Sequence, residues 1–423
     1  MLDLFRAYES DPSLEVGIAS GQTTIQKSSK SRYGASFISA RTFIAALKAL
    51  RDAELMIVST PHWDDPAGQN SRVTRYQATQ ALLEGVAHTG ASVADLRRNR
   101  NAEGIRLKDC KKKPVEYGEV AFANAARDRL RIINKMLENH WADLALTDDQ
   151  IADELKLIAG KRDDEASQSF DFAARTVYRV FNNCDWEQGG RFYGAWWISC
   201  PSKLRQSILI DGKRTVEVDY SGLHAAMLYA QEGMAIPDDP YERCLRQKGN
   251  KVERGLVKQT FNALLNADKI HGIQEIDGYS AEATGKNWPE FRLFVASQYP
   301  EFEPHFGSGI GLRLQRFDSD MAEDVILRFA NMQYGCLPVH DSFIVHHGLE
   351  DELNDMMVEA FKAKFGVECR VGVSSGIGEV LLSDDLSIKQ SIEERLTSQH
   401  GFDLRLEAFR DRRSRISELS QSE

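Results

Sequence analysis

The stretch Val216–Tyr229 reads VEVDYSGLHAAMLY, and it decides how the rest of the chain is interpreted. Its first residues alternate in polarity as in a strand, and the apolar residues after Ser221 recur at helical spacing. Asp219 therefore falls at a strand-to-helix junction, where a carboxylate is exposed on a rigidly held backbone. That position suits a metal ligand. The alternative is a helix-start residue that interacts favourably with the helix dipole.

Two further segments complement this aspartate. Arg254–Ala267 (RGLVKQTFNALLNA) places Arg254 and Lys258 on one face of a predicted helix. Leu337–Val345 (LPVHDSFIV) places Asp341 in a tight turn between two apolar strands. Two carboxylates and two cations are what phosphoryl transfer from a nucleoside triphosphate requires, provided that the aspartates converge across adjacent strands. Taken singly, these features are also common as a solvated cationic stripe and a turn aspartate.

Composition sets the broad class of protein. The chain has 423 residues, 42% of them hydrophobic and 27% charged, which is ordinary for a globular protein of two or three domains. It has no apolar run long enough for a membrane span and no signal peptide, and its six scattered cysteines favour a cytoplasmic protein without a zinc module. The net charge of −10 counts mildly against nucleic-acid binding, although one basic groove can coexist with an acidic periphery.

The N-terminal region, residues 1–115, has a pattern typical of nucleic-acid binding. Ser36–Glu54 predicts an amphipathic helix, and Leu55–Thr60 and Ser71–Thr79 predict two strands joined by a turn. Helix, strand, turn and strand in this order indicate the end of a winged helix, with any small α/β hairpin subdomain as the alternative. The basic stretch Arg97–Lys113 predicts an arm that contacts a nucleic-acid backbone, or a solvated linker.

The remaining chain divides into three parts. Residues 116–188 are predicted to be helical, with helices over Glu119–Leu144 and Glu165–Asn182. Residues 189–380 predict one α/β unit that contains all three segments described above. Residues 381–423 are charged and predict an exposed helix or a disordered tail. The fold class predicted from these patterns is α+β.

The three segments together resemble the motifs of a known family. Val218–Ala226 is similar to motif A of the family A DNA polymerases, whose core is the Asp-Tyr-Ser sequence found at Asp219–Ser221. Arg254 and Lys258 match the arginine and lysine of motif B on the fingers helix. Val339–Phe343 (VHDSF) resembles motif C, in a form closer to that of the single-subunit, phage-type RNA polymerases.

A fourth segment extends the resemblance. Leu314–Ile326 (LQRFDSDMAEDVI) is similar to the glutamine-bearing helix that precedes motif C, with Gln315 and Asp320 in register. The resemblance covers about half the chain, from Gly189 to Gly378. It implies a palm with an antiparallel sheet and abbreviated helical fingers, preceded by a thumb-like helical region at 116–188.

The resemblance also implies roles for individual residues. Asp219 and Asp341 would hold two Mg²⁺ ions, with Mn²⁺ as an alternative, and Arg254 and Lys258 would bind the triphosphate, with Lys258 balancing charge on the leaving pyrophosphate or protonating it. The expected partners are nucleoside triphosphates and a primer–template or single-stranded template. The other residues expected to contact substrate or nucleic acid are Tyr220, His224, Asn266, Gln315, Arg316 and His340.

Two departures from the family leave the sugar preference open. His224 stands where family A has a glutamate and the phage-type enzymes have a glycine, and Asn266-Ala267 replaces a Tyr-Gly pair. The size of His224 favours exclusion of ribose, whereas the His-Asp-Ser-Phe form of motif C favours RNA synthesis; we expect deoxynucleotides by a small margin.

Two other functions are compatible with the same residues. One is a non-catalytic DNA-binding protein of replication or regulation with a degenerate palm, and the other is a two-metal nuclease. His346-His347 follows motif C, but adjacent side chains on a strand point to opposite faces, so the pair is not expected to share one metal ion.

Overall fold

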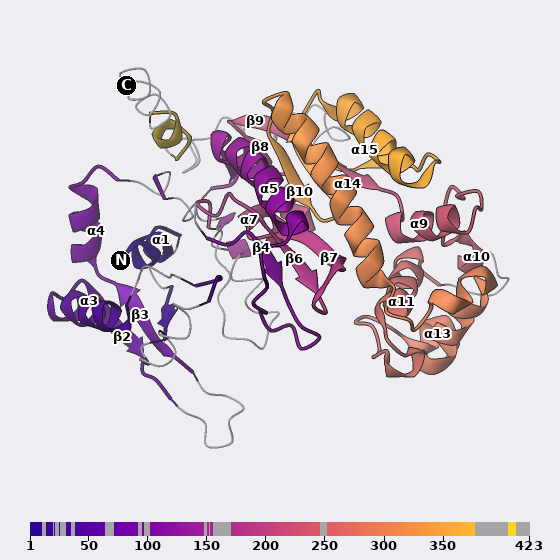
Figure 1. Cartoon of the computed structure of the whole chain (residues 1–423), viewed down its shortest axis with the longest axis horizontal. Helices are drawn as coiled ribbons and strands as arrows, with labels where there is room; N and C mark the ends of the chain where they lie inside the picture. The colour runs from indigo at the N-terminus through magenta and orange to yellow at the C-terminus, as the bar shows by residue number, and fades with distance from the viewer. Residues whose placement is uncertain are drawn as a thin grey trace.

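The computed structural model of the chain is a mixed α+β fold in which a small N-terminal unit lies beside a larger body (Figure 1). The structure describes residues 1–10, 14–19, 21, 25, 31–34, 39–63, 72–91, 95–96, 102–147, 150–151, 153–154, 171–245, 252–376 and 405–411. Four predicted segments lie wholly or partly outside these residues: most of the turn after Thr60, the first residues of the basic stretch, the second helix in 116–188 up to residue 170, and most of the tail.

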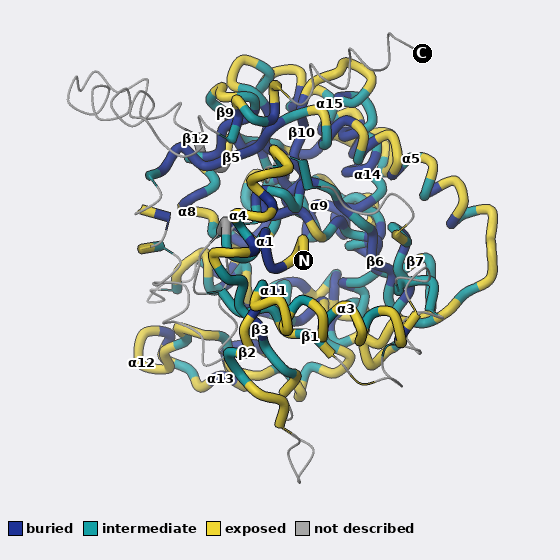
Figure 2. Tube along the Cα trace, turned by 90° about the vertical axis from the view of Figure 1, so that its left-hand side faces the viewer, coloured by how far each residue is buried: buried dark blue, intermediate teal, exposed yellow. Residues whose placement is uncertain are grey.

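The N-terminal unit is a three-stranded antiparallel sheet with helices. Its elements are α1 (Leu2–Ser10), β1 (Val16–Ile18), α3 (Ala40–Asp52), β2 (Met56–Thr60), β3 (Thr74–Ala78) and α4 (Gln80–Ala87). The strands are ordered β1-β3-β2, and Leu4, Met56, Tyr76 and Leu82 form a small core of their own. The predicted order of helix, strand and strand is therefore present, and most residues of α3 are exposed (Figure 2).

A second three-stranded sheet includes the end of the region predicted to be helical, residues 116–188. It is formed by β4 (Ile105–Leu107), β6 (Tyr178–Asn182) and β7 (Asp185–Tyr193), and α5 (Ala121–Asn139) packs beside it. The helix predicted to end at Leu144 ends at Asn139. The helix predicted over Glu165–Asn182 is wrong at its end, because Tyr178–Asn182 is a strand. The sequence YRVFN there is rich in aromatic and β-branched side chains, which favour a pleated surface.

The central sheet is antiparallel and carries the predicted motifs. Its order is β10-β11-β9-β8-β5, and β12 pairs with part of β9. The strands are β5 (Ala142–Leu144), β8 (Ile208–Ile210), β9 (Lys213–Tyr220), β10 (Cys336–Val339), β11 (Ser342–His346) and β12 (Val371–Gly376). Each of β10 and β11 is buried along nearly its whole length, so these strands lie at the centre of the large core.

Helices pack around this sheet and extend beyond it. The longer ones are α9 (Leu223–Gln231), α11 (Arg254–Asn266), α13 (Trp288–Ser297), α14 (Gly311–Asn331) and α15 (Glu350–Phe365). The short ones are α7 (Trp196–Ser199), α8 (Ser202–Arg205), α10 (Glu242–Leu245), α12 (Ala281–Thr284) and the 3₁₀ turns η2 (Ile270–Gly272) and η3 (Pro300–His305). In Figure 1, α10, α11 and α13 form a helical group at one end of the body.

The described part of the C-terminal region, residues 405–411, is helical and docks onto the body. Leu406 and Phe409 are buried in the large core, and Arg405 donates two hydrogen bonds, of 2.7 and 2.9 Å, to the buried carboxylate of Asp143 in β5. One face of this helix therefore contributes to the fold.

Candidate active site

The two predicted carboxylates lie at the ends of neighbouring strands. β9 and β11 are antiparallel, with Asp219 opposite Ser342, the residue that follows Asp341. The backbone N–H of Tyr220 also donates a hydrogen bond of 3.3 Å to the carbonyl of Asp341. The strand pairing therefore brings Asp219 and Asp341 to the same end of the sheet, as the sequence-based hypothesis requires.

A buried ion pair supports the turn that carries Asp341. Glu217 lies two residues before Asp219 on β9. Its carboxylate accepts hydrogen bonds of 2.9 Å from both Nε and Nη2 of Arg205. It also accepts a 2.7 Å bond from the hydroxyl of Ser342. Because Glu217 and Ser342 are buried, these bonds fix the start of β11 relative to β9.

A pocket of about 290 Å³ opens beside Asp341, and Asp219 is not one of the residues that line it. It is lined by Arg191, Gly222, Leu223, His224, Tyr241, Lys258, Asn262, Asn266, Gln315 and Asp341. These residues come from β7, the turn before α9, α9, the residue before α10, α11, α14 and the turn before β11, so segments far apart in the sequence meet here. The pocket contains Asp341, Lys258, His224, Asn266 and Gln315 of the predicted site.

The electrostatics at this end of the sheet fit a cation. Burial, and next the negative charge of Asp341, raise the pKa of Asp219 to about 6, and the ammonium of Lys258 opposes this rise. A carboxylate whose pKa is raised by a neighbouring carboxylate is relieved by a bound cation, and carboxylate oxygens are the ligands that Mg²⁺ prefers. Asp219 and Asp341 therefore fit the predicted magnesium ions.

Two buried polar atoms near the pocket are available to a ligand. Nε2 of His224 and Oδ1 of Asn262 have no hydrogen-bond partner among the described residues. Burial, and then the nearby charge of Arg191, lower the pKa of His224 to about 4, so its ring is neutral at pH 7. Buried polar atoms in proteins are usually hydrogen-bonded, so these two atoms are candidates to bond a water molecule or a ligand in the pocket.

Two predicted contacts need correction. The Tyr220 side chain is buried, and its hydroxyl donates a 2.8 Å hydrogen bond to the carbonyl of Met357 in α15, away from the pocket. Successive strand residues point to opposite faces, so Tyr220 cannot share the side of Asp219. Arg316 is also buried, donating a 2.8 Å bond to the carbonyl of Trp186, because it lies about 100° around α14 from Gln315.

Two other predicted residues lie at the margin of the site. Arg254 is half-exposed, and its Nε donates a 2.8 Å hydrogen bond to Asp239, outside the set of residues that line the pocket. His340 adopts a left-handed backbone conformation, with φ of 58°, in the turn before Asp341. Its ring packs edge-on against that of Tyr193, so it helps to shape the turn beside the pocket. Burial lowers the pKa of His340.

Sequence reasoning did not identify Arg191, Tyr241 and Asn262 as pocket residues. Arg191 lies in the glycine-rich strand β7 and forms a 2.6 Å ion pair with the buried Asp318 of α14. A side chain at Gly190 would come within 2.6 Å of the Ser319 hydroxyl, so glycine is what allows β7 to approach α14. In the sequence, Arg191 is an arginine that follows two glycines. This pattern indicates a pocket residue only when the position of α14 is known.

Comparisons with known proteins give weak similarity, and only to solved structures. No protein-family model matches the chain, and no curated protein matches it. Among solved structures, the chain is similar to the POL domain of Pol1 from M. smegmatis, in a complex with DNA primer-template and dNTP, with a TM-score of 0.32 and 12% identity. The match covers 60% of this chain and 51% of that one, so the chain spans about half the length of that structure. Similarity at this level does not indicate a shared function.

No helix in the described part of the chain is both long enough and apolar enough to cross a membrane.

Proposed function

We propose that the chain is a template-directed nucleic-acid polymerase that transfers nucleotides from nucleoside triphosphates. The observation that carries this proposal is the meeting of Asp219 and Asp341 at one end of the central sheet, beside a pocket that also contains Lys258. Carboxylates and a cation at one polar pocket are the elements that nucleotidyl transfer needs.

In this proposal Asp219 and Asp341 hold two Mg²⁺ ions, for which Mn²⁺ can substitute. When bound, such ions lower the pKa of an attacking hydroxyl and neutralise charge that develops on the phosphate. The protein contributes the fixed placement of the carboxylates, because the Glu217–Arg205 pair and the β9–β11 hydrogen bonds hold both strand ends.

Two cations of the pocket act on the phosphates. Lys258 is half-buried and close enough to Asp219 to affect its pKa, so it neutralises the triphosphate and can protonate the leaving pyrophosphate. Arg191 is held by Asp318 and adds a second fixed positive charge near Asp341. Arg254 contributes only after its guanidinium leaves Asp239, and we therefore assign it the smaller role.

The pocket favours deoxynucleotides over ribonucleotides in this proposal. His224 presents a buried, unpartnered Nε2 on the wall of the pocket, and its ring fills space that a smaller residue would leave open. A bulky side chain beside the sugar excludes the additional 2′-hydroxyl by contact, and Asn262 and Asn266 supply polar groups for the sugar and base.

The N-terminal unit is proposed to be a winged helix that binds duplex nucleic acid. This proposal is supported by the helix α3 followed by the strands β2 and β3, in a small antiparallel sheet of order β1-β3-β2. The exposed face of α3 carries Arg41, Lys48 and Arg51, which can contact phosphates or base edges in a groove.

Primer extension tests the enzymatic proposal. Purified protein is incubated with Mg²⁺, a primed DNA template labelled at the primer, and either dNTPs or NTPs. We expect extension, and we expect Asp219→Asn and Asp341→Asn to reduce it by about 10³-fold or more, because each removes a ligand of the ions. Shortening of the labelled strand would instead indicate the nuclease, and DNA binding without either reaction would indicate a non-catalytic protein.

A further inference from the structure

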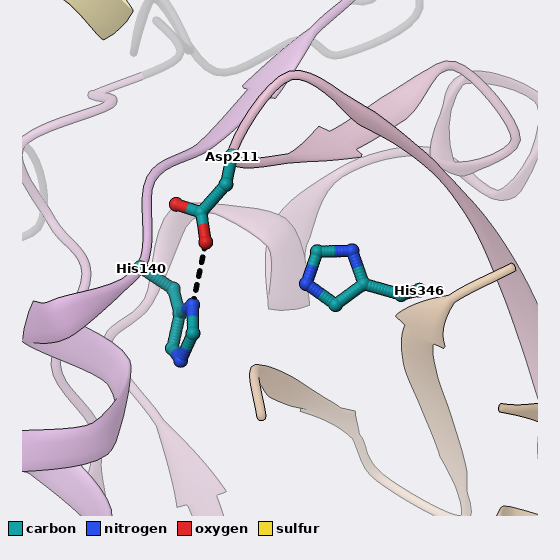
Figure 3. Close-up of side chains that lie close together, drawn as sticks. All are labelled: His140, Asp211 and His346. Atoms are coloured by element: carbon teal, nitrogen blue, oxygen red, sulfur yellow. Dashed lines mark hydrogen bonds and ion pairs between the residues drawn. The ribbon is translucent and has the colours of Figure 1, made fainter. Parts of the chain in front are cut away.

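A second cluster of possible metal ligands lies at the opposite end of the same strands. His140 follows α5, Asp211 lies in the turn between β8 and β9, and His346 ends β11. One ligand atom from each of the three lies within 4.8 Å of the other two. Figure 3 shows both imidazole rings and the carboxylate turned toward one another. Because three distant segments supply these groups, the cluster is a product of the fold.

The carboxylate of Asp211 is held firmly in place. Its Oδ1 accepts a 2.8 Å hydrogen bond from the backbone N–H of Trp141. The backbone N–H of Asp211 donates a 2.7 Å hydrogen bond to the carbonyl of Trp141. This leaves Oδ2 facing His140, whose Nδ1 is 2.6 Å away. The arrangement therefore presents one carboxylate oxygen and one imidazole nitrogen in a fixed orientation.

His346 completes the set and is poorly satisfied by the protein. Its Nδ1 is buried and has no hydrogen-bond partner among the described residues. Its ring centroid is 6.3 Å from that of His140, and in Figure 3 the other ring nitrogen, Nε2, is the one turned toward the His140–Asp211 pair.

We propose that His140, Asp211 and His346 bind a Zn²⁺ ion, with water as the fourth ligand. Two imidazoles and a carboxylate suit zinc, which is commonly four-coordinate, and do not suit Mg²⁺, which prefers oxygen ligands. Bonds of zinc to nitrogen and oxygen place ligand atoms roughly 3.4 Å apart. The distance between His140 Nδ1 and Asp211 Oδ2 must therefore increase by less than about 1 Å when zinc binds. The proton that these two atoms share is then replaced by the ion.

The ion would tie together the end of the sheet that is remote from the pocket. Asp211 precedes Asp219 by eight residues along a strand, which corresponds to about 25 Å. The docked C-terminal helix also reaches this place, because Arg410 donates a 3.3 Å hydrogen bond to the carbonyl of Asp211. Zinc there would link α5, the β8–β9 turn and β11, and the role that we assign to it is to hold these segments together. This inference does not depend on the proposed polymerase activity.

Metal titration of the tag-free, full-length protein tests the site. Co²⁺, a spectroscopic substitute for zinc, is added in excess Mg²⁺, which occupies oxygen-rich sites. We expect one equivalent to bind with the visible absorption of four-coordinate Co²⁺ and without sulfur charge-transfer bands, since two exposed cysteines, Cys110 and Cys184, are the competing ligands. Zn²⁺ should displace the Co²⁺, raise the melting temperature and release protons.

Matched variants separate this site from adventitious binding. His346→Ala and His140→Asn should each weaken Co²⁺ binding by about 100-fold or more, since loss of even an outer-shell partner costs 10–100-fold. His347→Ala is the control, because the neighbouring ring is exposed and lies 3.5 Å from Glu350. Circular dichroism confirms that each variant is folded. No Co²⁺ uptake by the wild type, or equal uptake by His346→Ala and His347→Ala, would overturn the proposal.

Discussion

The two ends of the β9–β11 strand pair differ in the ligands that they offer. At one end, Asp219 and Asp341 provide carboxylates beside Lys258 and an open pocket. At the other end, His140 and His346 provide imidazoles around the single carboxylate of Asp211. Oxygen ligands suit Mg²⁺, and mixed nitrogen and oxygen ligands suit zinc. One pair of strands thus separates a proposed catalytic site from a proposed structural one.

The two ends also differ in how well the protein compensates their charges. The pKa of Asp219 is raised by burial and by Asp341, whereas that of Asp211 is lowered, because the hydrogen bonds from His140 and Trp141 outweigh its burial. The pocket end stores repulsion that a bound cation relieves, whereas at the other end the carboxylate of Asp211 already has hydrogen-bond partners. Such a contrast is typical of a catalytic site and a structural one.

Among the substitutions that test this comparison, Lys258→Ala is expected to have the largest effect on activity. Lys258→Ala should lower the rate of nucleotide incorporation by about 10²–10³-fold, because it removes a cation that faces the transferred phosphates. Arg254→Ala is the matched control on the same helix, and we expect a loss of at most about tenfold because Arg254 is paired with Asp239. Single-turnover rates would measure both. Equal losses, or none for Lys258→Ala, would contradict the roles assigned here.

Glu217 lies between the two ends, and its removal should affect the whole strand pair. Glu217→Ala leaves the Arg205 guanidinium without its buried partner and should lower the free energy of unfolding by about 3–5 kcal/mol. Urea denaturation measures this change. The double variant with Arg205→Met should recover part of the loss, and failure to recover any would show that the ion pair is not the source of the effect.

A smaller effect should come from His224. His224→Gly opens the wall of the pocket, so we expect the preference for dNTP over NTP to fall by about tenfold, a change of about 1.4 kcal/mol in relative transition-state binding. Competition between dATP and ATP on a primed template measures the ratio. An unchanged ratio would show that another residue selects the sugar.

The smallest effect concerns stability and pH. The folded state raises the pKa of Asp219 to about 6, so the metal-free protein should lose stability as pH rises from about 4 to 6, the window between the unfolded and folded pKa values. Asp219→Asn should therefore melt at a higher temperature than wild type at pH 7.5 in EDTA, and the difference should vanish near pH 4. A variant that is less stable at pH 7.5 would contradict this account.

The local elements of the central sheet could largely be predicted from sequence. The alternation in Val216–Tyr229 and the turn at Asp341 predicted the strands and the helix that the structure contains, because period-two and helical patterns are local properties. The helix predicted over Glu165–Asn182 was wrong at its end, because an apolar repeat of short length fits either element and the neighbouring strands decide between them.

The candidate site was harder to predict because it depends on side-chain direction and on distant segments. Tyr220 and Arg316 each adjoin a residue at the site, but the pleat of β9 and the turn of α14 point them elsewhere. Arg191 enters the pocket only because β7 packs against α14. His346 was considered only with its neighbour His347, whereas its companions in the fold are 206 and 135 residues away in the sequence.

The most direct test compares a variant at each end of the strand pair in parallel, measuring Mg²⁺-dependent primer extension and bound zinc in the same preparations. Our account predicts that Asp341→Asn loses extension and keeps one zinc ion per chain, whereas His346→Ala loses the zinc and, at a temperature where it is folded, keeps extension. Extension at the wild-type rate by folded Asp341→Asn would contradict the central claim that this aspartate holds the catalytic ions.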